Sequence, residues 1–233
     1  MTVDRLLQSK SLSLSSSQRE AEYPLVIIVD DDTPVREALS ELVSSAGFES
    51  MSFASTGELL EANILDRPGC LILDVRMPGA SGLDLQNYLA ETGNPKPIIF
   101  LTGHGDIPMT VQAMKAGAVD FLTKPVRDQT LLDAVAAGIA ADASQRRETV
   151  ARKYNIERFE TLTKRERDVL QGVANGRLNK QIAFDLGISE VTVKMHRSSG
   201  MRKMEARSLG DFVRIWETIP DSMRASERLL SSM

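Results

Sequence analysis

Charged residues directly follow several short apolar runs, and this pattern constrains how the N-terminal part of the chain folds. Asp30, Asp31 and Asp32 follow Leu25 to Val29, Asp74 follows Leu71-Ile72-Leu73, and Lys124-Pro125 comes soon after Phe121-Leu122. In an open α/β sheet, the carboxyl ends of parallel strands meet at one edge, where ligands bind. The sequence therefore predicts a cluster of carboxylates facing one lysine.

Strand-like runs alternate with helix-period segments up to about Ala143. The expected strands are Leu25 to Val29, Glu49 to Phe53, Cys70 to Leu73, Ile98 to Leu101 and Ala118 to Leu122. Five strands alternating with helices are typical of βα units around a parallel sheet. We predict an α/β fold with a five-stranded parallel sheet, (βα)5.

Capping residues suggest where the helices begin and end. The first helix has Thr33 as its expected N-cap, Pro34 at its first position and Gly47 at its end. Asp106 and Gly117 frame a later helix in the same way. The final helix of this part is expected from about Asp128 to Ala143.

The rest of the chain is predicted to form a small all-α module. Its expected helices lie near Lys164 to Ala174, Lys180 to Leu186, Glu190 to Met204 and Leu209 to Thr218, with a tight turn at Gly187-Ile188-Ser189. Residues 144–160 are charged and poor in strand formers, which favours a linker. We expect a disordered tail over 1–23, domains over 24–143 and 161–219, and a flexible C-terminus over 220–233.

The two parts carry opposite charge. Residues 1–143 contain 10 Lys and Arg against 20 Asp and Glu, whereas residues 144–233 contain 18 against 12. A basic module beside an acidic one is typical of a nucleic-acid-binding domain joined to a partner domain, although a solvated basic face would look the same.

Cysteine content and hydropathy favour a cytoplasmic protein without membrane contact. The single cysteine, Cys70, lies in an apolar run and is expected in the core. A lone cysteine forms no intramolecular disulfide, which fits a reducing compartment. The apolar stretches are far shorter than the roughly 20 residues of a membrane-spanning helix, and residues 1–23 lack the apolar core of a signal peptide.

Four fragments in register resemble the receiver domain of bacterial two-component response regulators. They are Val29-Asp30-Asp31-Asp32, Leu73-Asp74-Val75-Arg76-Met77-Pro78-Gly79, Leu101-Thr102-Gly103-His104-Gly105-Asp106 and Phe121-Leu122-Thr123-Lys124-Pro125. Attack by a carboxylate on a phosphoryl group requires that charge be neutralised on both reactants, which Mg²⁺ with oxygen ligands provides. The resemblance implies that Asp74 accepts the phosphoryl group. It also implies that Asp31 and Asp74 ligate Mg²⁺ directly. Asp30 would act largely through a bound water, and the Arg76 main-chain carbonyl would add another oxygen.

The same resemblance assigns roles near the fourth and fifth strands. Lys124 would pair with a phosphoryl oxygen, as cationic side chains do in phosphoryl transfer generally. Thr102 would hydrogen-bond another phosphoryl oxygen. Phe121 would turn inward when Thr102 moves, which couples the chemistry to the surface of the domain. The Lys124-Pro125 bond is expected to be cis.

Each of these residues has a simpler interpretation. The three aspartates could cap the helix at Pro34, and we assign only Asp32 to that role. Thr102 could be a turn residue and Phe121 a core residue. His104 is expected to be a surface loop residue rather than a metal ligand.

The C-terminal module resembles the helix-turn-helix of the LuxR/NarL class, and the whole chain is most similar to FixJ-type regulators. The resemblance is carried by Leu162-Thr163-Lys164-Arg165-Glu166 through Asn179-Lys180-Gln181-Ile182-Ala183 to Gly187-Ile188-Ser189-Glu190-Val191-Thr192-Val193-Lys194. Ala183 allows two helices to cross closely, and Gly187 permits the positive φ of the turn. The expected small core consists of Ile182, Leu186, Ile188 and Val193.

The helix after this turn is expected to enter the DNA major groove. Residues expected near DNA are Thr192, Lys194, Met195 and Arg197 to Ser199, with Lys180, Arg202 and Lys203 as candidates for phosphate contacts. An exposed helix face for the basic residues and core packing for Met195 are the alternatives. The helical register calls for an apolar side chain at Gly200, so we expect a packing loss and a locally soft helix there.

Together these patterns predict a DNA-binding transcriptional response regulator. A sensor histidine kinase would phosphorylate Asp74, and a homodimer would place two recognition helices on promoter DNA. RNA polymerase is a further candidate partner. No enzymatic turnover is expected beyond slow self-dephosphorylation.

Two other functions compete with this prediction. An aspartyl-nucleophile enzyme such as a phosphatase is disfavoured, because those hydrolases carry a second aspartate two residues after the nucleophile, where this chain has Arg76. A receiver that acts only through protein contact is disfavoured by the basic C-terminal module.

Overall fold

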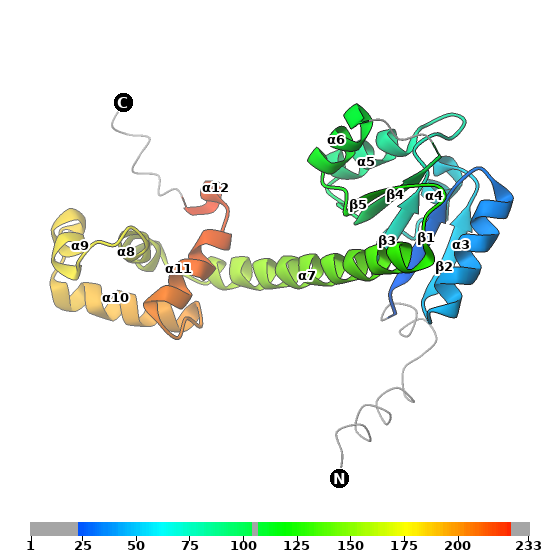
Figure 1. The fold of residues 1–233 in the computed structure, drawn as a ribbon. Coiled ribbons are helices and arrows are strands. Elements are labelled where there is room, and N and C mark those ends of the chain that lie inside the picture. Colours follow the sequence, from blue (N-terminus) through cyan, green and yellow to red (C-terminus); the bar gives the residue numbers. More distant parts are fainter. Residues whose placement is uncertain (1–22, 104–106, 225–233) are drawn as a thin grey trace, which may run out of the picture. The chain divides into compact units, whose positions relative to one another are not determined.

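A computed structural model describes residues 23–103 and 107–224, which form two compact units divided between residues 145 and 146 (Figure 1). Among these residues no helix is both long and apolar enough to cross a membrane. Residues 1–22 of the expected tail, residues 225–233 of the expected flexible C-terminus, the loop residue His104 and the helix-framing Asp106 lie outside the described residues.

The first unit contains the predicted five-stranded parallel sheet (Figure 1). Its strands are β1 (Leu25–Val29), β2 (Glu49–Phe53), β3 (Gly69–Leu73), β4 (Ile98–Thr102) and β5 (Asp120–Thr123), in the order β2-β1-β3-β4-β5. Strand β5 begins at Asp120 rather than at Ala118, because the Ala118 amide still donates to the Ala113 carbonyl of the preceding helix. The fold class predicted from the sequence is confirmed.

Alternate side chains of the central strands enter two separate cores, as the period of two in a strand requires. Leu25, Ile27 and Val29 of β1 pack on one face of the sheet, with Leu85 and Leu89 of α5 (Gly82–Glu91). The remaining helices of that face are α4 (Thr56–Ala62) and α6 (Ile107–Lys115). Helix α3 (Thr33–Ser45) covers the other face together with the start of α7 (Asp128–Glu160). Cys70 is fully buried between β1 and α7, as expected, and burial raises its pKa to about 12.

The start of α3 differs from the sequence prediction. Asp32, which we also assigned to cap this helix, is the N-cap rather than Thr33, but its side chain makes no capping hydrogen bond. Pro34 therefore occupies the second helical position rather than the first. Gly47 adopts φ 87° directly after the C-cap, which is the left-handed geometry that ends a helix at glycine.

Helix α7 continues to Glu160, so the prediction that it ends near Ala143 is wrong. No proline or glycine interrupts residues 139–160, and the Gln, Arg, Glu and Ala residues there are good helix formers. A run of charge indicates a solvated segment but does not exclude a helix. The expected linker over 144–160 is therefore helical.

The second unit consists of the predicted helices with nearly the predicted bounds. They are α8 (Lys164–Ala174), α9 (Asn179–Leu186), α10 (Glu190–Lys203) and α11 (Leu209–Thr218), followed by the short α12 (Asp221–Arg224), which was not predicted. Gly187 ends α9 in the left-handed region with φ 65°, as the turn requires. Ile182 and Val193 are buried, with Leu186 and Ile188 packed against them, which confirms the expected small core.

Trp216 lies at the centre of the core of the second unit. Its ring stands 5.5 Å from that of Phe159 at the end of α7 and 5.3 Å from that of Phe212, measured between centroids. The side chain is 2% exposed, and it is the single tryptophan of the chain. Its fluorescence therefore reports on the unfolding of this unit alone.

Gly200 is closely packed, so the expected packing loss at this position is wrong. A Cβ atom at Gly200 would lie 2.7 Å from Cδ1 and 3.1 Å from Cγ of Leu170, which is itself fully buried in α8. Leu170 fills the space that the helical pattern assigned to an apolar residue at position 200. The glycine thus permits close contact between α8 and α10.

We predict opposite effects of two Gly→Ala substitutions in this unit. Gly210→Ala in α11 meets no atom within 4 Å, and it should stabilise the unit by up to about 1 kcal/mol through helix propensity. Gly200→Ala should instead lower the free energy of unfolding by about 1 kcal/mol, because overpacking costs about 1–3 kcal/mol and exceeds the propensity gain. Urea unfolding followed by Trp216 fluorescence measures both. Equal stabilisation by the two variants would contradict the close contact.

Candidate functional site

Three carboxylates meet at the carboxyl edge of the sheet. Oxygen atoms of Asp30, Asp31 and Asp74 lie within 4.8 Å of one another. Asp30 and Asp74 are 2% and 8% exposed, whereas Asp31 is open to solvent. The Asp74 amide donates to the Val29 carbonyl at 2.9 Å, which holds the ends of β1 and β3 together. A set of hard oxygen donors with one solvent-facing member suits Mg²⁺, which retains several waters when bound.

Four interactions fix the position of Asp30. Its amide donates to the Phe53 carbonyl at 3.2 Å, and its carbonyl accepts from Arg36 Nη1 at 2.7 Å. Its carboxylate accepts from the Asp32 amide at 3.0 Å and from Lys124 Nζ at 2.5 Å. Each oxygen of the buried carboxylate therefore accepts one hydrogen bond, and the charge is paired with Lys124, as a buried charge requires.

Lys124 bridges two of the carboxylates. Its Nζ lies 2.5 Å from Asp30 Oδ2 and 3.4 Å from Asp74 Oδ2. Burial disfavours the charged ammonium group, but the hydrogen bond to Asp30 and the negative charges of both aspartates outweigh it and raise the pKa of Lys124. The predicted cis bond between Lys124 and Pro125 is present.

The other expected residues of this site lie around the same edge. Thr102 is the last residue of β4 and 1% exposed, and its carbonyl accepts from the Lys124 amide at 2.8 Å. The Arg76 amide donates to Asp74 Oδ1 at 3.4 Å, while the metal-binding role of the Arg76 carbonyl stays a prediction. Phe121 is half-buried and packs against the core with its ring 5.9 Å from that of Phe100, while its switch role stays a prediction.

Gly82 packs directly against the Asp74 backbone, and no sequence pattern predicted this contact. Its amide donates to the Val75 carbonyl at 3.1 Å. A Cβ atom at this position would clash with the Asp74 carbonyl and stand 3.0 Å from Leu73 Cγ. The first turn of α5 can therefore approach the Asp74 backbone only with glycine there. The position of Gly82 directly after the N-cap Ser81 was a weak signal.

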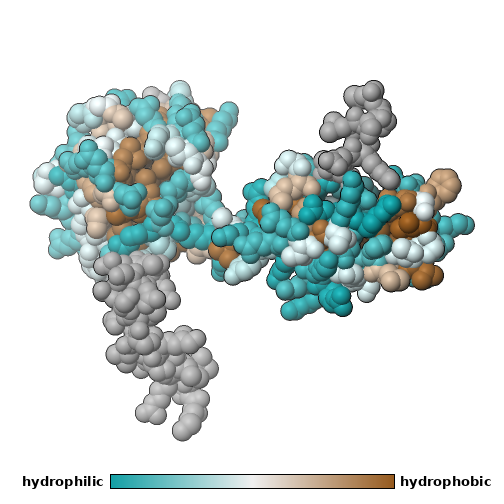
Figure 2. Space-filling view, turned by 180° about the vertical axis from the view of Figure 1, so that it is seen from behind, coloured by the Kyte–Doolittle hydropathy of each residue, from teal (hydrophilic) through white to brown (hydrophobic). Residues whose placement is uncertain are grey.

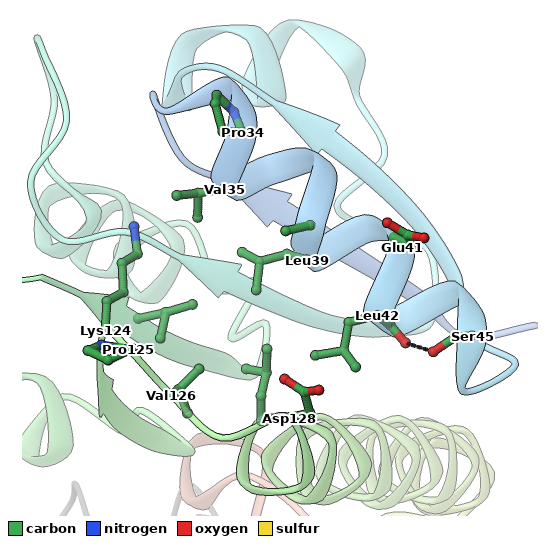
Figure 3. A pocket seen from close by; sticks show the side chains of 13 residues that line it. Pro34, Val35, Leu39, Glu41, Leu42, Ser45, Lys124, Pro125, Val126 and Asp128 are labelled. Carbon is green, nitrogen blue, oxygen red and sulfur yellow. Dashed lines mark hydrogen bonds between the residues drawn. The ribbon is translucent and has the colours of Figure 1, made fainter.

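A groove of about 650 Å³ opens beside Lys124, between α3 and α7 (Figure 3). Leu39 and Leu42 point from α3 toward Val126, and Asp128 lies at the rim where α7 begins. Lys124 lines this groove and also contacts Asp30 and Asp74, so it lies between the groove and the carboxylate cluster.

In the second unit, the expected DNA-binding residues lie on α9, on α10 and at their ends. Lys180, Lys194, Met195, Ser198 and Arg202 are exposed, and Thr192, Arg197 and Lys203 are partly exposed. Met195 is 67% exposed, so the core interpretation for it is wrong. Figure 2 shows apolar side chains on the surface at the α9 and α10 end of this unit, where Phe184 is 88% exposed.

Two of the expected DNA contacts already have partners within the unit. Arg197 Nη1 donates to Asn179 Oδ1 at 3.1 Å. Lys203 Nζ donates to Glu166 Oε2 at 2.7 Å and to the Thr161 carbonyl at 3.1 Å. Lys203 therefore joins the end of α10 to the start of α8 whether or not it also contacts phosphate.

Glu166 is the buried centre of this connection. Burial raises its pKa, but hydrogen bonds from Lys203, from the Thr163 amide and from Ser199 outweigh that effect and lower the pKa to about 2. The residue also closes a capping box with Thr163, the N-cap of α8. The sequence shows the capping box, but it does not show that α10 supplies the cation.

Known proteins share both units. The response regulator receiver domain family matches residues 26–136, and the luxR family of bacterial regulatory proteins matches residues 160–216. The chain is 50% identical over 206 residues to nodulation protein W of Bradyrhizobium diazoefficiens, covering 88% of this chain and 90% of that protein. It is 46% identical over 191 residues to the transcriptional regulatory protein FixJ of Azorhizobium caulinodans, covering 82% and 90%.

Solved structures agree with this match. The response regulator StyR superposes with a TM-score of 0.69 at 48% identity, covering 84% of this chain and 100% of that one. Full-length FixJ from B. japonicum gives 0.52 at 36% identity, covering 84% and 96%. The chain belongs to the two-component response regulators of the FixJ/NarL type, which join a receiver domain to a LuxR-type DNA-binding domain. It is a DNA-binding transcription regulator rather than a classical enzyme.

We predict that Glu166→Gln destabilises the DNA-binding unit by about 3 kcal/mol at pH 7, because the pKa falls from 4.5 to about 2 on folding. A carboxyl group whose pKa is lower in the folded state stabilises the fold, and this contribution is complete at pH values above the pKa of the unfolded state. The difference between parent and variant should therefore persist above pH 4.5 and shrink as the pH falls toward 2. Urea unfolding by Trp216 fluorescence at several pH values measures it. The exposed Glu217→Gln is the matched control and should shift stability by less than about 0.5 kcal/mol; a similar loss in both variants would contradict the role of Glu166.

Proposed function

We propose that Asp74 is phosphorylated by a sensor histidine kinase in the cytoplasm, and that the modification activates DNA binding through homodimerisation. The observation that carries this proposal is the geometry around Asp74. A nearly buried carboxylate stands beside two further carboxylates and a lysine that contacts it at 3.4 Å. Structural carboxylates are rarely gathered in this way unless a cation joins them.

The residues suit phosphoryl transfer to a carboxylate. Asp30, Asp31, Asp74 and the Arg76 carbonyl would hold Mg²⁺, which when bound neutralises charge on the phosphoryl oxygens. An Asp74 oxygen would form a bond to phosphorus while the bond between phosphorus and the donor histidine nitrogen breaks. Lys124 would move its hydrogen bond from Asp74 to a phosphoryl oxygen, and the Thr102 hydroxyl would bind another. Phe121 would then follow Thr102 inward, toward Phe100.

The groove between α3 and α7 supports docking of a protein donor. Its lining is largely apolar, and it ends at Lys124, next to the proposed acceptor. A partner seated there would approach Asp74 without entering the core. RNA polymerase remains a candidate partner of the DNA-bound regulator.

We predict a single phosphoryl adduct when the protein is incubated with Mg²⁺ and acetyl phosphate. Asp74→Asn should abolish the adduct, because an amide is not a nucleophile toward phosphorus. Asp32→Asn is the matched control and should keep it, because Asp32 is exposed and lies outside the group of three carboxylates. Intact-protein mass spectrometry measures the adduct.

Light scattering on the same samples tests the dimer. The mass of the modified parent should double, and that of Asp74→Asn should not. A modified parent that stays monomeric would overturn the dimer mechanism, and an adduct that persists in Asp74→Asn would overturn the acceptor assignment.

For DNA, we propose that α10 enters the major groove. Thr192, Lys194, Met195, Arg197 and Ser198 would then lie near base edges and phosphates, and Lys180, Arg202 and Lys203 would contact phosphates. The exposed positions of Lys180, Lys194 and Arg202 support this placement. Lys203 would have to share its ammonium group with Glu166, so we expect it to contribute least.

We predict that Lys194→Ala weakens binding of the acetyl-phosphate-treated protein to a random-sequence duplex and reduces the slope of log K against log salt by about 1. Arg214→Ala on α11 is the matched control, with a side chain that is 79% exposed but lies outside α9 and α10. It should leave the slope unchanged. An affinity of the parent that does not depend on salt would instead favour a regulator acting through protein contact.

A further inference from the structure

We propose that Arg36 is a positioning residue of the carboxylate cluster, which holds the turn between β1 and α3 so that Asp30 and Asp31 face the metal. The inference deepens the proposed function and rests on it. The Arg36 side chain donates to the Asp30 main-chain carbonyl and to Thr33, not to a carboxylate of the cluster. It would act through the backbone that carries two of the metal-binding carboxylates.

The guanidinium group joins the end of the strand to the start of the helix. Arg36 Nη1 donates to the Asp30 carbonyl at 2.7 Å, and Nη2 donates to Thr33 Oγ1 at 2.8 Å. The Arg36 amide also donates to the Asp32 carbonyl at 3.0 Å, in the first turn of α3. One side chain and its own backbone therefore contact the segment that carries Asp31 at Asp30, Asp32 and Thr33.

The other hydrogen bonds of this segment hold Asp30, whose amide donates to Phe53 and whose carboxylate accepts from the Asp32 amide and from Lys124. Asp32 makes no capping hydrogen bond through its side chain, and Asp31 is exposed. Asp30 is 2% exposed, and Arg36 is the side chain that donates to its carbonyl. A buried carbonyl that loses its donor is costly, so the backbone would shift or admit water. Either change would displace the adjacent Asp31 carboxylate relative to Asp30 and Asp74, because the Asp30 carboxylate keeps its hydrogen bonds to Lys124 and the Asp32 amide.

Arginine suits this role better than lysine. Its planar group presents two parallel donors at once, whereas the lysine ammonium group is a compact charge that cannot reach both acceptors in the same geometry. A lysine at position 36 should therefore support the turn only in part.

The direction of the change in Mg²⁺ affinity distinguishes a positioning role of Arg36 from a purely electrostatic one. A cation at position 36 repels Mg²⁺, so if Arg36 mattered only through its charge, Arg36→Gln would bind Mg²⁺ more tightly. Positioning predicts the reverse. Loss of partners that orient metal ligands typically weakens metal affinity by 10–100-fold.

The experiment is Mg²⁺ titration of the full-length protein by isothermal calorimetry. We expect Arg36→Gln to weaken the affinity about 10-fold, and Arg36→Lys to fall between that variant and the parent. The matched control is Arg127→Gln, which removes the same charge from an exposed position of the receiver and should stay within about twofold. Equal or tighter binding by Arg36→Gln would overturn the inference. Should Arg36→Gln fail to fold, as judged by circular dichroism, Arg36→Lys decides alone, with parent-like affinity overturning the inference.

A second readout separates this inference from the function on which it rests. The rate of adduct formation with acetyl phosphate, measured against Mg²⁺ concentration, should shift to higher Mg²⁺ in Arg36→Gln while the rate at saturation stays within a few-fold. A parent that forms no adduct on Asp74 overturns the proposed function. A parent that forms it with the same Mg²⁺ dependence as Arg36→Gln overturns only the role of Arg36.

Discussion

The ion pair network of Lys124 is the interaction on which the receiver site depends. Asp30 and Asp74 are almost fully buried at the ends of β1 and β3, and their charges would repel each other without a cation between them. Removing one partner from such a buried pair leaves a charge without compensation, which is more costly than never burying the pair. Lys124 supplies one positive charge against three carboxylates, so the cluster suits a further cation.

The sheet supplies the geometry of this site. Strands β1 and β3 are neighbours in register, with Val29 opposite Leu73, so the residues that follow them, Asp30 and Asp74, emerge side by side. Strand β4 lies between β3 and β5, and the Thr102 carbonyl accepts the Lys124 amide. Arg36 and Gly82 then set how closely α3 and α5 approach the strand ends. Strand register therefore sets which residues meet at the site, and the helices set how closely the neighbouring backbone approaches it.

The DNA-binding unit also contains a buried carboxylate whose charge is satisfied by residues of neighbouring segments. Glu166 is buried at the start of α8, and its charge is satisfied by its capping partner and by residues of α10. Gly200 and Leu170 bring the same two helices into close contact. Helix α10 is thus fixed on its inner side, while Lys194, Met195 and Ser198 remain exposed on its outer side. A firm support behind this exposed face suits the proposed entry of α10 into the major groove.

The sequence by itself determined the elements and the motif residues. Strand runs and the turn at Gly187 are local patterns, and the order of Asp30, Asp74, Thr102 and Lys124 follows from the strands that precede them. Apart from the carboxylate cluster with Lys124 and the small core around Val193, it did not determine which atoms of different elements meet. The continuation of α7 escaped prediction because a charged helix and a charged linker have similar composition. Only the tertiary structure decided the roles of four residues, Gly82, Gly200, Lys203 and Arg36. Each role depends on an atom of another residue that packing, strand register or a side-chain rotamer brings close in space. The periodicity of the sequence does not encode such contacts.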